Sequence, residues 1–404
     1  PGKGRGVFQG ALDHMTLERG KVPTEVRGTP RPSDLRMENR ITALVQAPGD
    51  HDLLFARSPG KGLHKSTDRG ATWKPANGNL RSGAGLAVRS VAVHPANNSI
   101  VLRAGGRVRE GTLQSGLWRS TDGGTTWKLV TQEIDFDGRG PTTFFGEVVA
   151  FCPEDPNLVL AGGETKGVFL SRDAGLTWEP VGLAGERITC LAFSPGTSTP
   201  IVGTFADSEF EALGLDTPAV PLDAPGGIYR GEFKNGEMRF KEACRVNAFG
   251  VVNIAAGTHP NFSTYATTRG VYYTWQRDNA FSQRRHQLPA DTFFTALGCR
   301  LYMKETRPNE HRQKVDTYAA PFSSDLPNPV HKVPERATGK WALVASKVTI
   351  EGKAASLDLG SGISCLLPDA ADAKTLFLCN IDGVFKSSDG GRTYVRVLAG
   401  APSR

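Results

Sequence analysis

The sequence predicts an all-β fold, a seven-bladed β-propeller built from four-stranded antiparallel blades. Three observations indicate it: one turn motif recurs along the chain, its copies lie at blade spacing, and the segments between them read as short strands with almost no helical periodicity. A propeller closes its sheets into a ring, and the ring protects strand edges that would otherwise be exposed.

The recurring motif has the pattern S-x-D-x-G-x-T-[WY]. Four segments keep it: KSTDRGATW (65–73), RSTDGGTTW (119–127), LSRDAGLTW (170–178) and KSSDGGRTY (386–394). The first three serines, at positions 66, 120 and 171, are 54 and 51 residues apart, and the fourth, at 387, follows by 216. That interval leaves room for three eroded copies, which we assign to 226–240, 269–281 and 321–325. Seven units of this length are typical of propeller blades.

Each unit reads as four short strands. In the first unit the expected strands are 41–48, 52–58, 62–66 and 72–76. Alternating β-branched residues that stop at Pro-containing turns favour a strand–turn–strand arrangement. The propeller is therefore expected to span 40–404. Residues 1–39, rich in Gly, Pro and charge, are expected to form an N-terminal extension that packs along the outside or stays mobile.

The aspartates of the four motifs, Asp68, Asp122, Asp173 and Asp389, are interpreted as structural. A short Asp side chain can accept hydrogen bonds from the amides of its own turn, and Ser or Thr can do so more weakly. Gly124 can take a positive φ, and Trp127 offers a large apolar surface to pack between blades.

The motif resembles the Asp-box, or BNR repeat, of the Asp-box β-propeller superfamily. That superfamily includes sialidases, xyloglucan-active glucanases, sortilin-type receptors and a photosystem II assembly factor. The resemblance covers roughly residues 40–397, and it implies that each motif occupies the turn between the third and fourth strands of a blade. Ligand sites of such propellers usually lie on the opposite face, around the central channel.

Charged residues on the connections of that opposite face are the candidate ligand-binding residues. They are Arg107, Arg109, Arg139, Glu164, Arg187, Asp207, Arg269 and Arg285. Long loops on a rigid scaffold often carry function, and 205–227 and 276–288 are long for a propeller.

No cofactor is expected, and no metal site is assigned. Asp135 and Asp137 in EIDFDGRG are weak metal candidates, because the segment lacks the spacing of a calcium loop. The six cysteines form no CxxC or Cys/His cluster, which argues against zinc. Cys365 and Cys379 are expected either to pair across adjacent strands as a disulfide or to be buried free thiols.

Sialidases and xyloglucanases of the superfamily each have a motif that this sequence lacks. The Arg-Ile-Pro segment of sialidases is missing, since the corresponding region reads MENRITAL (37–44). Xyloglucanases resemble the chain in the first blade, but ARSPGKG (56–62) has Pro59 where their catalytic Asp stands. The sequence therefore favours a non-catalytic binding or scaffold propeller that recognises a protein, glycan or envelope partner. The alternative is a glycoside hydrolase or related polysaccharide-active enzyme.

Composition adds limits on partners and location. The net charge is +7, but the basic residues are scattered, so a nucleic-acid role is not expected. No run of 18 apolar residues occurs, so no membrane span is expected. The chain begins at Pro1, which suggests removal of an N-terminal segment. We expect a secreted, periplasmic or cell-surface protein, with a role as a subunit of a larger complex left open.

Overall fold

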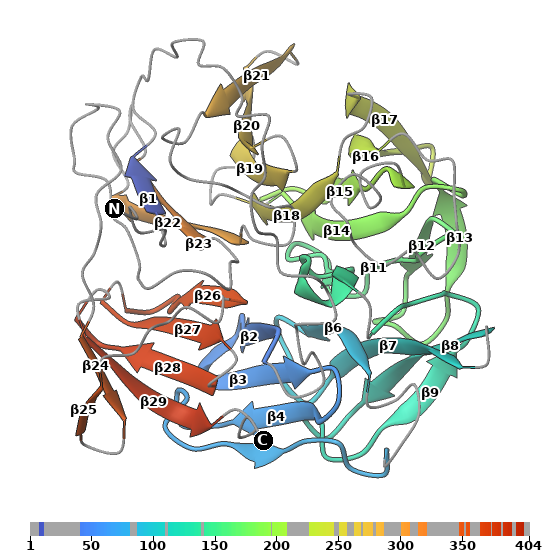
Figure 1. Cartoon of the computed structure of the whole chain (residues 1–404). Helices are drawn as coiled ribbons and strands as arrows, with labels where there is room; N and C mark the ends of the chain where they lie inside the picture. Colours follow the sequence, from blue (N-terminus) through green and yellow to red (C-terminus); the bar gives the residue numbers. More distant parts are fainter. Residues whose placement is uncertain are drawn as a thin grey trace.

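Strands dominate the computed structural model, and their sheets form a ring (Figure 1). The structure describes residues 8–11, 41–80, 87–109, 112–138, 141–194, 196–207, 226–245, 250–256, 262–267, 270–277, 280–286, 300–307, 314–320, 347–350, 353–355, 364–372, 374–380, 383–389 and 393–399. Over these ranges no helix is long and apolar enough to cross a membrane.

Five sheets follow the predicted pattern of four consecutive antiparallel strands. The first three contain β2 (Ala43–Ala47), β3 (Asp50–Ser58), β4 (Gly62–Ser66) and β5 (Lys74–Pro75); β6 (Val88–Val93), β7 (Val101–Arg109), β8 (Thr112–Ser120) and β9 (Lys128–Thr131); and β10 (Val149–Phe151), β11 (Val159–Gly162), β12 (Val168–Ser171) and β13 (Glu179–Gly182). The next two contain β14 (Ile188–Phe193), β15 (Pro200–Thr204), β16 (Gly227–Lys234) and β17 (Glu237–Arg245); and β18 (Val251–Ala256), β19 (Phe262–Thr267), β20 (Gly270–Arg277) and β21 (Ala280–His286).

The two remaining sheets depart from four antiparallel strands. One contains β22 (Arg300–Arg307), β23 (Lys314–Ala320) and β1 (Phe8–Ala11), and the other contains β24 (Lys347–Ile350), β25 (Lys353–Ala355), β26 (Cys365–Pro368), β27 (Leu376–Asn380), β28 (Gly383–Ser387) and β29 (Thr393–Ala399). In the latter, β24 pairs with β29 in parallel, so a strand from outside the repeat extends the sheet. The predicted all-β propeller architecture is confirmed, whereas the count of seven complete blades stays a prediction. The eroded copy at 321–325 lies outside the described residues.

The repeated turns are held by their own side chains. In the turn after β8, the Ser120 hydroxyl donates to Asp122 Oδ1 over 2.7 Å, and the Thr126 hydroxyl and N–H donate to the two carboxylate oxygens over 2.6 and 2.8 Å. Asp68, Asp173 and Asp389 accept the matching bonds in their turns. The carboxylates are thus engaged with local donors.

Gly124 meets two requirements in the turn after β8. Its φ is 86°, and a Cβ placed there would lie 3.2 Å from the Phe55 ring of the preceding sheet. Glycine suits both the positive φ and the close approach.

Replacing Asp68 with alanine should lower the melting temperature by about 1–3 °C, because the turn amides and hydroxyls lose their acceptor. Hydrogen bonds from the Thr72 hydroxyl, the Thr72 N–H and the Ser66 hydroxyl hold the pKa of Asp68 at about 2, below its ordinary 3.8. A depressed carboxyl pKa contributes stability above pH 3.8 that is lost as the pH falls toward 2. Thermal unfolding of both proteins across this range checks the prediction; a pH-independent difference would contradict it.

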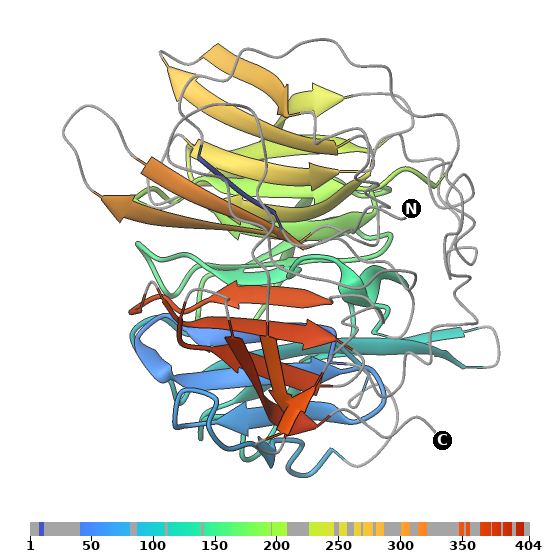
Figure 2. The same cartoon turned by 60° about the vertical axis from the view of Figure 1, so that its left-hand side comes forward.

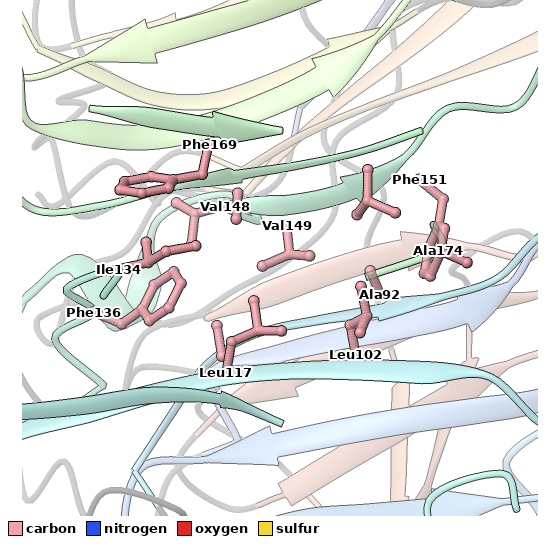
Figure 3. Close-up of a cluster of buried hydrophobic side chains, with 13 residues drawn as sticks. Ala92, Leu102, Leu117, Ile134, Phe136, Val148, Val149, Phe151, Phe169 and Ala174 are labelled. Atoms are coloured by element: carbon pink, nitrogen blue, oxygen red, sulfur yellow. The ribbon is translucent and has the colours of Figure 1, made fainter. Parts of the chain in front are cut away.

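Apolar side chains fill the interfaces between neighbouring sheets. Figure 3 shows the cluster between the second and third sheets, where Leu102 and Leu117 face Val149 and Phe169. A second cluster between the first two sheets includes Trp127, whose indole N–H donates to the Ala76 carbonyl over 3.0 Å. Burial of these surfaces holds adjacent sheets face to face, at roughly 25 cal/mol per Å² of apolar area.

The first and last sheets of the ring meet through the same kind of packing. Leu44 and Leu54 lie in one apolar cluster with Phe377 and both cysteines of the last sheet. Cys365 and Cys379 are register partners on β26 and β27, as expected from the sequence, and both are buried. Of the two expected states, the structure contains buried thiols and not the disulfide.

The segment between β9 and β10 lies at the middle of the ring (Figure 1, the short teal helix). It contains a 3-10 helix, η4 (Pro141–Phe144), followed by Phe145 and Gly146. The fully buried Phe145 ring stacks on Phe205, which follows β15, at a centroid distance of 5.2 Å. A Cβ at Gly146 would lie 2.6 Å from the Asn253 side chain on β18. Side chains from several sheets therefore pack on this segment at the centre.

Candidate functional site

Three of the predicted ligand-binding residues come together on the face opposite the repeated turns. Arg187 directly precedes β14, Glu164 lies in the β11–β12 connection, and Asp207 follows β15. In a four-stranded meander, two connections lie at the same edge of the sheet. One joins the second and third strands, and the other enters the first strand. Local strand order therefore places all three residues on this face.

Arg187 bonds both acidic residues. Its Nη1 donates to Glu164 Oε2 in a short ion pair, and its Nε donates to Asp207 Oδ1 over 3.1 Å. The side chains of Arg187 and Glu164 are 1% and 6% exposed, whereas that of Asp207 is 18% exposed. The guanidinium thus joins one buried and one partly accessible carboxylate. We call these three residues the Glu164–Arg187–Asp207 cluster.

The two carboxylates of this cluster occupy different environments. Burial raises the pKa of Glu164 above its ordinary 4.5; Arg187 opposes this rise, and the nearby Asp137 adds to it. A carboxyl group with a raised pKa keeps its proton to higher pH and can act as a general acid. Asp207, the second carboxylate on the same guanidinium, is more exposed than Glu164.

Asp135 holds the segment that carries Glu164. Its carboxylate accepts bonds from the Thr165 hydroxyl and N–H, over 2.6 and 2.9 Å, and from the Lys166 N–H over 3.3 Å. Its backbone carbonyl accepts the Glu164 N–H over 2.8 Å. Asp135 and Asp137 were the weak metal candidates, and among the described residues no group of three or more His, Cys, Asp or Glu side chains is arranged to hold a metal ion.

Replacing Asp135 with alanine should speed amide hydrogen exchange at Thr165 and Lys166 by at least about tenfold, because both N–H groups lose their acceptor and the loop opens locally. Hydrogen exchange followed by mass spectrometry on peptides covering 163–168 measures this. Replacing Asp155, whose carboxylate accepts the Asn157 N–H in another exposed turn, serves as a control and should leave these peptides unchanged. Unchanged exchange at 163–168 in the Asp135 variant would contradict the positioning role.

Two further buried arginines with polar partners were not predicted from the sequence. Arg57, at the end of β3, forms an ion pair with Glu147 at 3.3 Å and donates to the Phe145 carbonyl over 3.0 Å. Arg89, on β6, donates to the carbonyls of Gly146 and Thr189 over 2.7 and 2.6 Å. An arginine within an otherwise buried strand was the available signal, since such a charge needs a partner.

The other predicted residues are placed only in part. Arg107 and Arg109 lie at the end of β7, opposite Gln114 and Thr112 of β8, in a hairpin that extends beyond its neighbours (Figure 2, cyan). Arg285 lies on β21 opposite Tyr272. Arg139 and Arg269 lie outside the described residues.

The β3–β4 connection departs from the first-blade pattern of xyloglucanases noted in the sequence. Pro59 follows the last residue of β3, and the turn closes at Gly62, where Ser58 is the register partner. No carboxylate is supplied at this position. Any acid–base chemistry on this face must come from other connections, among which the Glu164–Arg187–Asp207 cluster is one.

Curated relatives of the chain are xyloglucanases. No protein-family model matches it. Xyloglucanase Xgh74A of Acetivibrio thermocellus is 28% identical over 137 residues, 33% of this chain and 16% of that enzyme. A xyloglucanase of Hypocrea jecorina is 29% identical over 261 residues, 46% of this chain and 29% of that enzyme. The matches thus span less than a third of the length of either relative.

Solved structures with a similar fold include two GH74 enzymes and one other propeller, YCF48. The GH74 xyloglucanase from Xanthomonas campestris has a TM-score of 0.64 at 15% identity, covering 90% of this chain and 55% of that one. The Niastella koreensis GH74 enzyme has a TM-score of 0.63 at 14% identity, covering 90% and 54%. YCF48 bound to D1 peptide has a TM-score of 0.51 at 13% identity, covering 87% and 92%.

These relatives correct the functional prediction. The sequence favoured a non-catalytic binding or scaffold propeller, because the sialidase Arg-Ile-Pro segment is missing and Pro59 replaces an expected Asp. That prediction is wrong: the curated relatives are glycoside hydrolases and favour the alternative. The absence of one motif residue is weak evidence, because one fold can carry its chemistry at different positions. The chain has a β-propeller fold similar to that of the xyloglucanase structures.

Proposed function

We propose that this protein is a glycoside hydrolase that cleaves a polysaccharide, with the Glu164–Arg187–Asp207 cluster as its catalytic centre. The observation that carries the proposal is a buried and a partly exposed carboxylate bonded to one guanidinium on the functional face. Similarity to xyloglucanases makes xyloglucan the first substrate to test. An extracytoplasmic location is part of the proposal, since such polymers lie outside the cell.

The pairing of two carboxylates with one guanidinium supports this chemistry. Glu164 and Asp207 bond different nitrogens of Arg187, so one side chain holds both groups. Glycosidases act with two carboxyl groups beside the scissile bond, and this cluster supplies two.

The roles follow from the environments of the two groups. Glu164, whose pKa is raised by burial, protonates the leaving glycosidic oxygen. In one route Asp207 takes a proton from a water molecule that attacks the anomeric carbon. In the other Asp207 attacks that carbon itself, and water, deprotonated by the Glu164 carboxylate, then hydrolyses the glycosyl–enzyme ester; the product anomer distinguishes these routes. Arg187 fixes both carboxylates and keeps them apart. Asp137 raises the pKa of the acid through charge repulsion.

Pro59 is one reason for assigning the catalytic carboxylates to the third and fourth sheets. Because the chain has no carboxylate at that first-blade position, the proposal places the acid on the third sheet and the second carboxylate on the fourth. A site matching the first-blade pattern of the relatives would require a different residue there.

The experiment is hydrolysis of defined polysaccharides by the purified chain. Xyloglucan, mixed-linkage β-glucan and cellulose are incubated separately, and released reducing ends and the product anomer are followed by colorimetry and proton NMR. We expect new reducing ends from at least one β-glucan, with a single initial anomer. Folded protein that releases no reducing ends from any of the three would overturn the proposal.

A further inference from the structure

The basic residue before the motif serine connects neighbouring sheets at three interfaces of the ring. Its side-chain nitrogen donates to the backbone carbonyl of the residue after the motif aspartate in the neighbouring sheet. The bond recurs between the first and second sheets, the second and third, and the last and first. It runs from Lys65 Nζ to Gly123 over 2.8 Å, from Arg119 Nε to Ala174 over 3.0 Å and from Lys386 Nζ to Arg69 over 2.8 Å.

The acceptor residue is fixed from two sides at all three interfaces. Its φ is positive, at 52° for Arg69, 67° for Gly123 and 55° for Ala174. A positive φ is uncommon for residues other than glycine, and it persists where the surroundings hold it. Here the N–H of the residue bonds its own sheet, whereas the carbonyl bonds the cation of the preceding sheet. The N–H groups donate to the carbonyls of Asp52, Ser99 and Asn157, over 3.0, 2.9 and 3.0 Å.

The cation is replaced by an apolar residue where the neighbouring sheet has no aspartate motif. In the third sheet the residue before the serine is Leu170, which is buried with Leu191 and Phe193 of the fourth sheet. The fourth sheet has no motif aspartate, and its turn after β16 is reached by an exposed side chain, that of Arg172. A cation before the serine thus accompanies an aspartate turn across the interface, so the bond belongs to the repeat.

The interface between the last and first sheets is where the ring closes, and we call it the closing seam (Figure 1, red and blue). Its two sheets come from opposite ends of the chain. Among the described strands, none of the first sheet pairs with one of the last, and β1 joins β23 in a different sheet. Arg69 forms an ion pair with Asp369 at 3.4 Å, and Gln46 donates to the Asp369 carboxylate over 2.9 Å. Side chains therefore hold this seam.

We propose that Lys386 is the latch of the closing seam: its bond to the Arg69 carbonyl keeps the seam shut, and its loss lets the seam open locally while other interfaces stay closed. A hydrogen bond from a charged donor is stronger than one between neutral groups. The Lys386 ammonium also lies 5.6 Å from the centre of the Phe377 ring, which steadies the side chain. The links from Lys65 and Arg119 reinforce sheets that follow each other along the chain. The latch is independent of the proposed hydrolysis.

Buried thiols report on the opening of the closing seam. Cys365 and Cys379, the seam cysteines, lie in its apolar cluster with 0% of their surface exposed, and the Leu44 N–H donates to Cys365 Sγ over 3.3 Å. Cys152 is equally buried in the cluster between the third and fourth sheets. The reduced full chain is labelled with iodoacetamide under native conditions, and mass spectrometry follows each cysteine. A rise at Cys152 marks global unfolding, whereas a rise at the seam cysteines alone marks opening of the seam.

Lys386→Met should raise the labelling rate of the seam cysteines by about tenfold and leave Cys152 unchanged, because reaction requires the seam to open. Lys65→Met, which removes the link between the first and second sheets, should leave the rates at all three cysteines unchanged. Lys386→Arg keeps a donor, as Arg119 does in its own link, and should label at the unmodified rate. An unchanged rate at the seam cysteines in Lys386→Met, or an equal rise at Cys152, would overturn the proposal.

Hydrogen exchange tests the direction of the link. In Lys386→Met the peptide covering 67–73 of the first sheet should exchange faster, while the peptide covering 121–127 keeps its rate, and Lys65→Met should show the reverse. Each variant is thus the control for the other. Lys386→Thr suits a strand but is too short to cross the seam, so it carries the same expectations if the methionine variant folds poorly. An unchanged rate at 67–73 in these Lys386 variants would count against the latch.

Discussion

Glu164→Gln should reduce polysaccharide hydrolysis by about 10²–10⁴-fold, the usual contribution of a general acid. Glutamine keeps the shape of the side chain and can still bond Arg187, but it cannot deliver a proton. The effect should fall on kcat rather than on substrate affinity. Initial rates of reducing-end release at saturating substrate measure it, and circular dichroism checks that the variant is folded.

A matched control separates the role of Glu164 from a general loss of charge. Glu179, on β13, pairs with Arg172 at 3.2 Å and is 57% exposed. Glu179→Gln should therefore hydrolyse the substrate at the unmodified rate. Equal rates in both variants would remove Glu164 from the mechanism.

The pH dependence of hydrolysis gives a further test of Glu164 as the acid. Because burial raises the pKa of Glu164, the acid form persists to higher pH than for an ordinary glutamate. The rate should fall as the pH rises through this raised pKa, and Glu164→Gln should lack that alkaline limb. A substrate with an activated leaving group needs less proton donation, so it should recover much of the lost rate.

Arg187→Met is the second change with a large expected effect. It should lower the free energy of unfolding by about 3–5 kcal/mol. Removing the guanidinium leaves Glu164 buried without its counter-charge, while methionine roughly preserves the volume. Urea unfolding measures the difference. Arg172→Met is the control, because an exposed pair contributes about 0–1 kcal/mol.

This destabilisation should depend on pH with a definite sign. Glu164 has a folded pKa above its ordinary 4.5, so the folded state binds its proton more tightly than the unfolded state. The resulting stability is present below pH 4.5 and is lost as the pH rises through the folded pKa. Without Arg187 this folded pKa rises further, so the penalty should shrink as the pH falls. Adding Glu164→Gln to Arg187→Met should recover part of the loss, and an unchanged penalty in the double variant would contradict the argument.

Local chemistry explains which parts of the fold were predictable. The Ser120–Asp122–Thr126 bonds lie within one turn of seven residues, so the sequence motif alone specifies their donors and acceptors. The strands of the first five sheets follow directly from alternation and turn residues. The parallel pairing of β24 with β29 depends on a distant segment, and no local pattern encodes it.

The candidate site was predictable residue by residue but not as an arrangement. Arg187, Glu164 and Asp207 were each assigned to the functional face from strand order. Their shared ion pairs depend on how the third and fourth sheets pack, which spacing does not determine. Arg57 and Glu147 were missed because 88 and 90 residues separate Arg57 from its partners Phe145 and Glu147.

The packed centre of the ring limits how a polymer can approach. Phe145 and Phe205 are fully buried there, and arginines from the first two sheets bond the adjoining backbone. Under the proposed function, the packing of the described central residues directs a glycan chain across the face and not along the ring axis. Binding across an open face allows attack at internal linkages, so endo-type products of mixed length are the expected outcome, with little processive release of short units from a chain end.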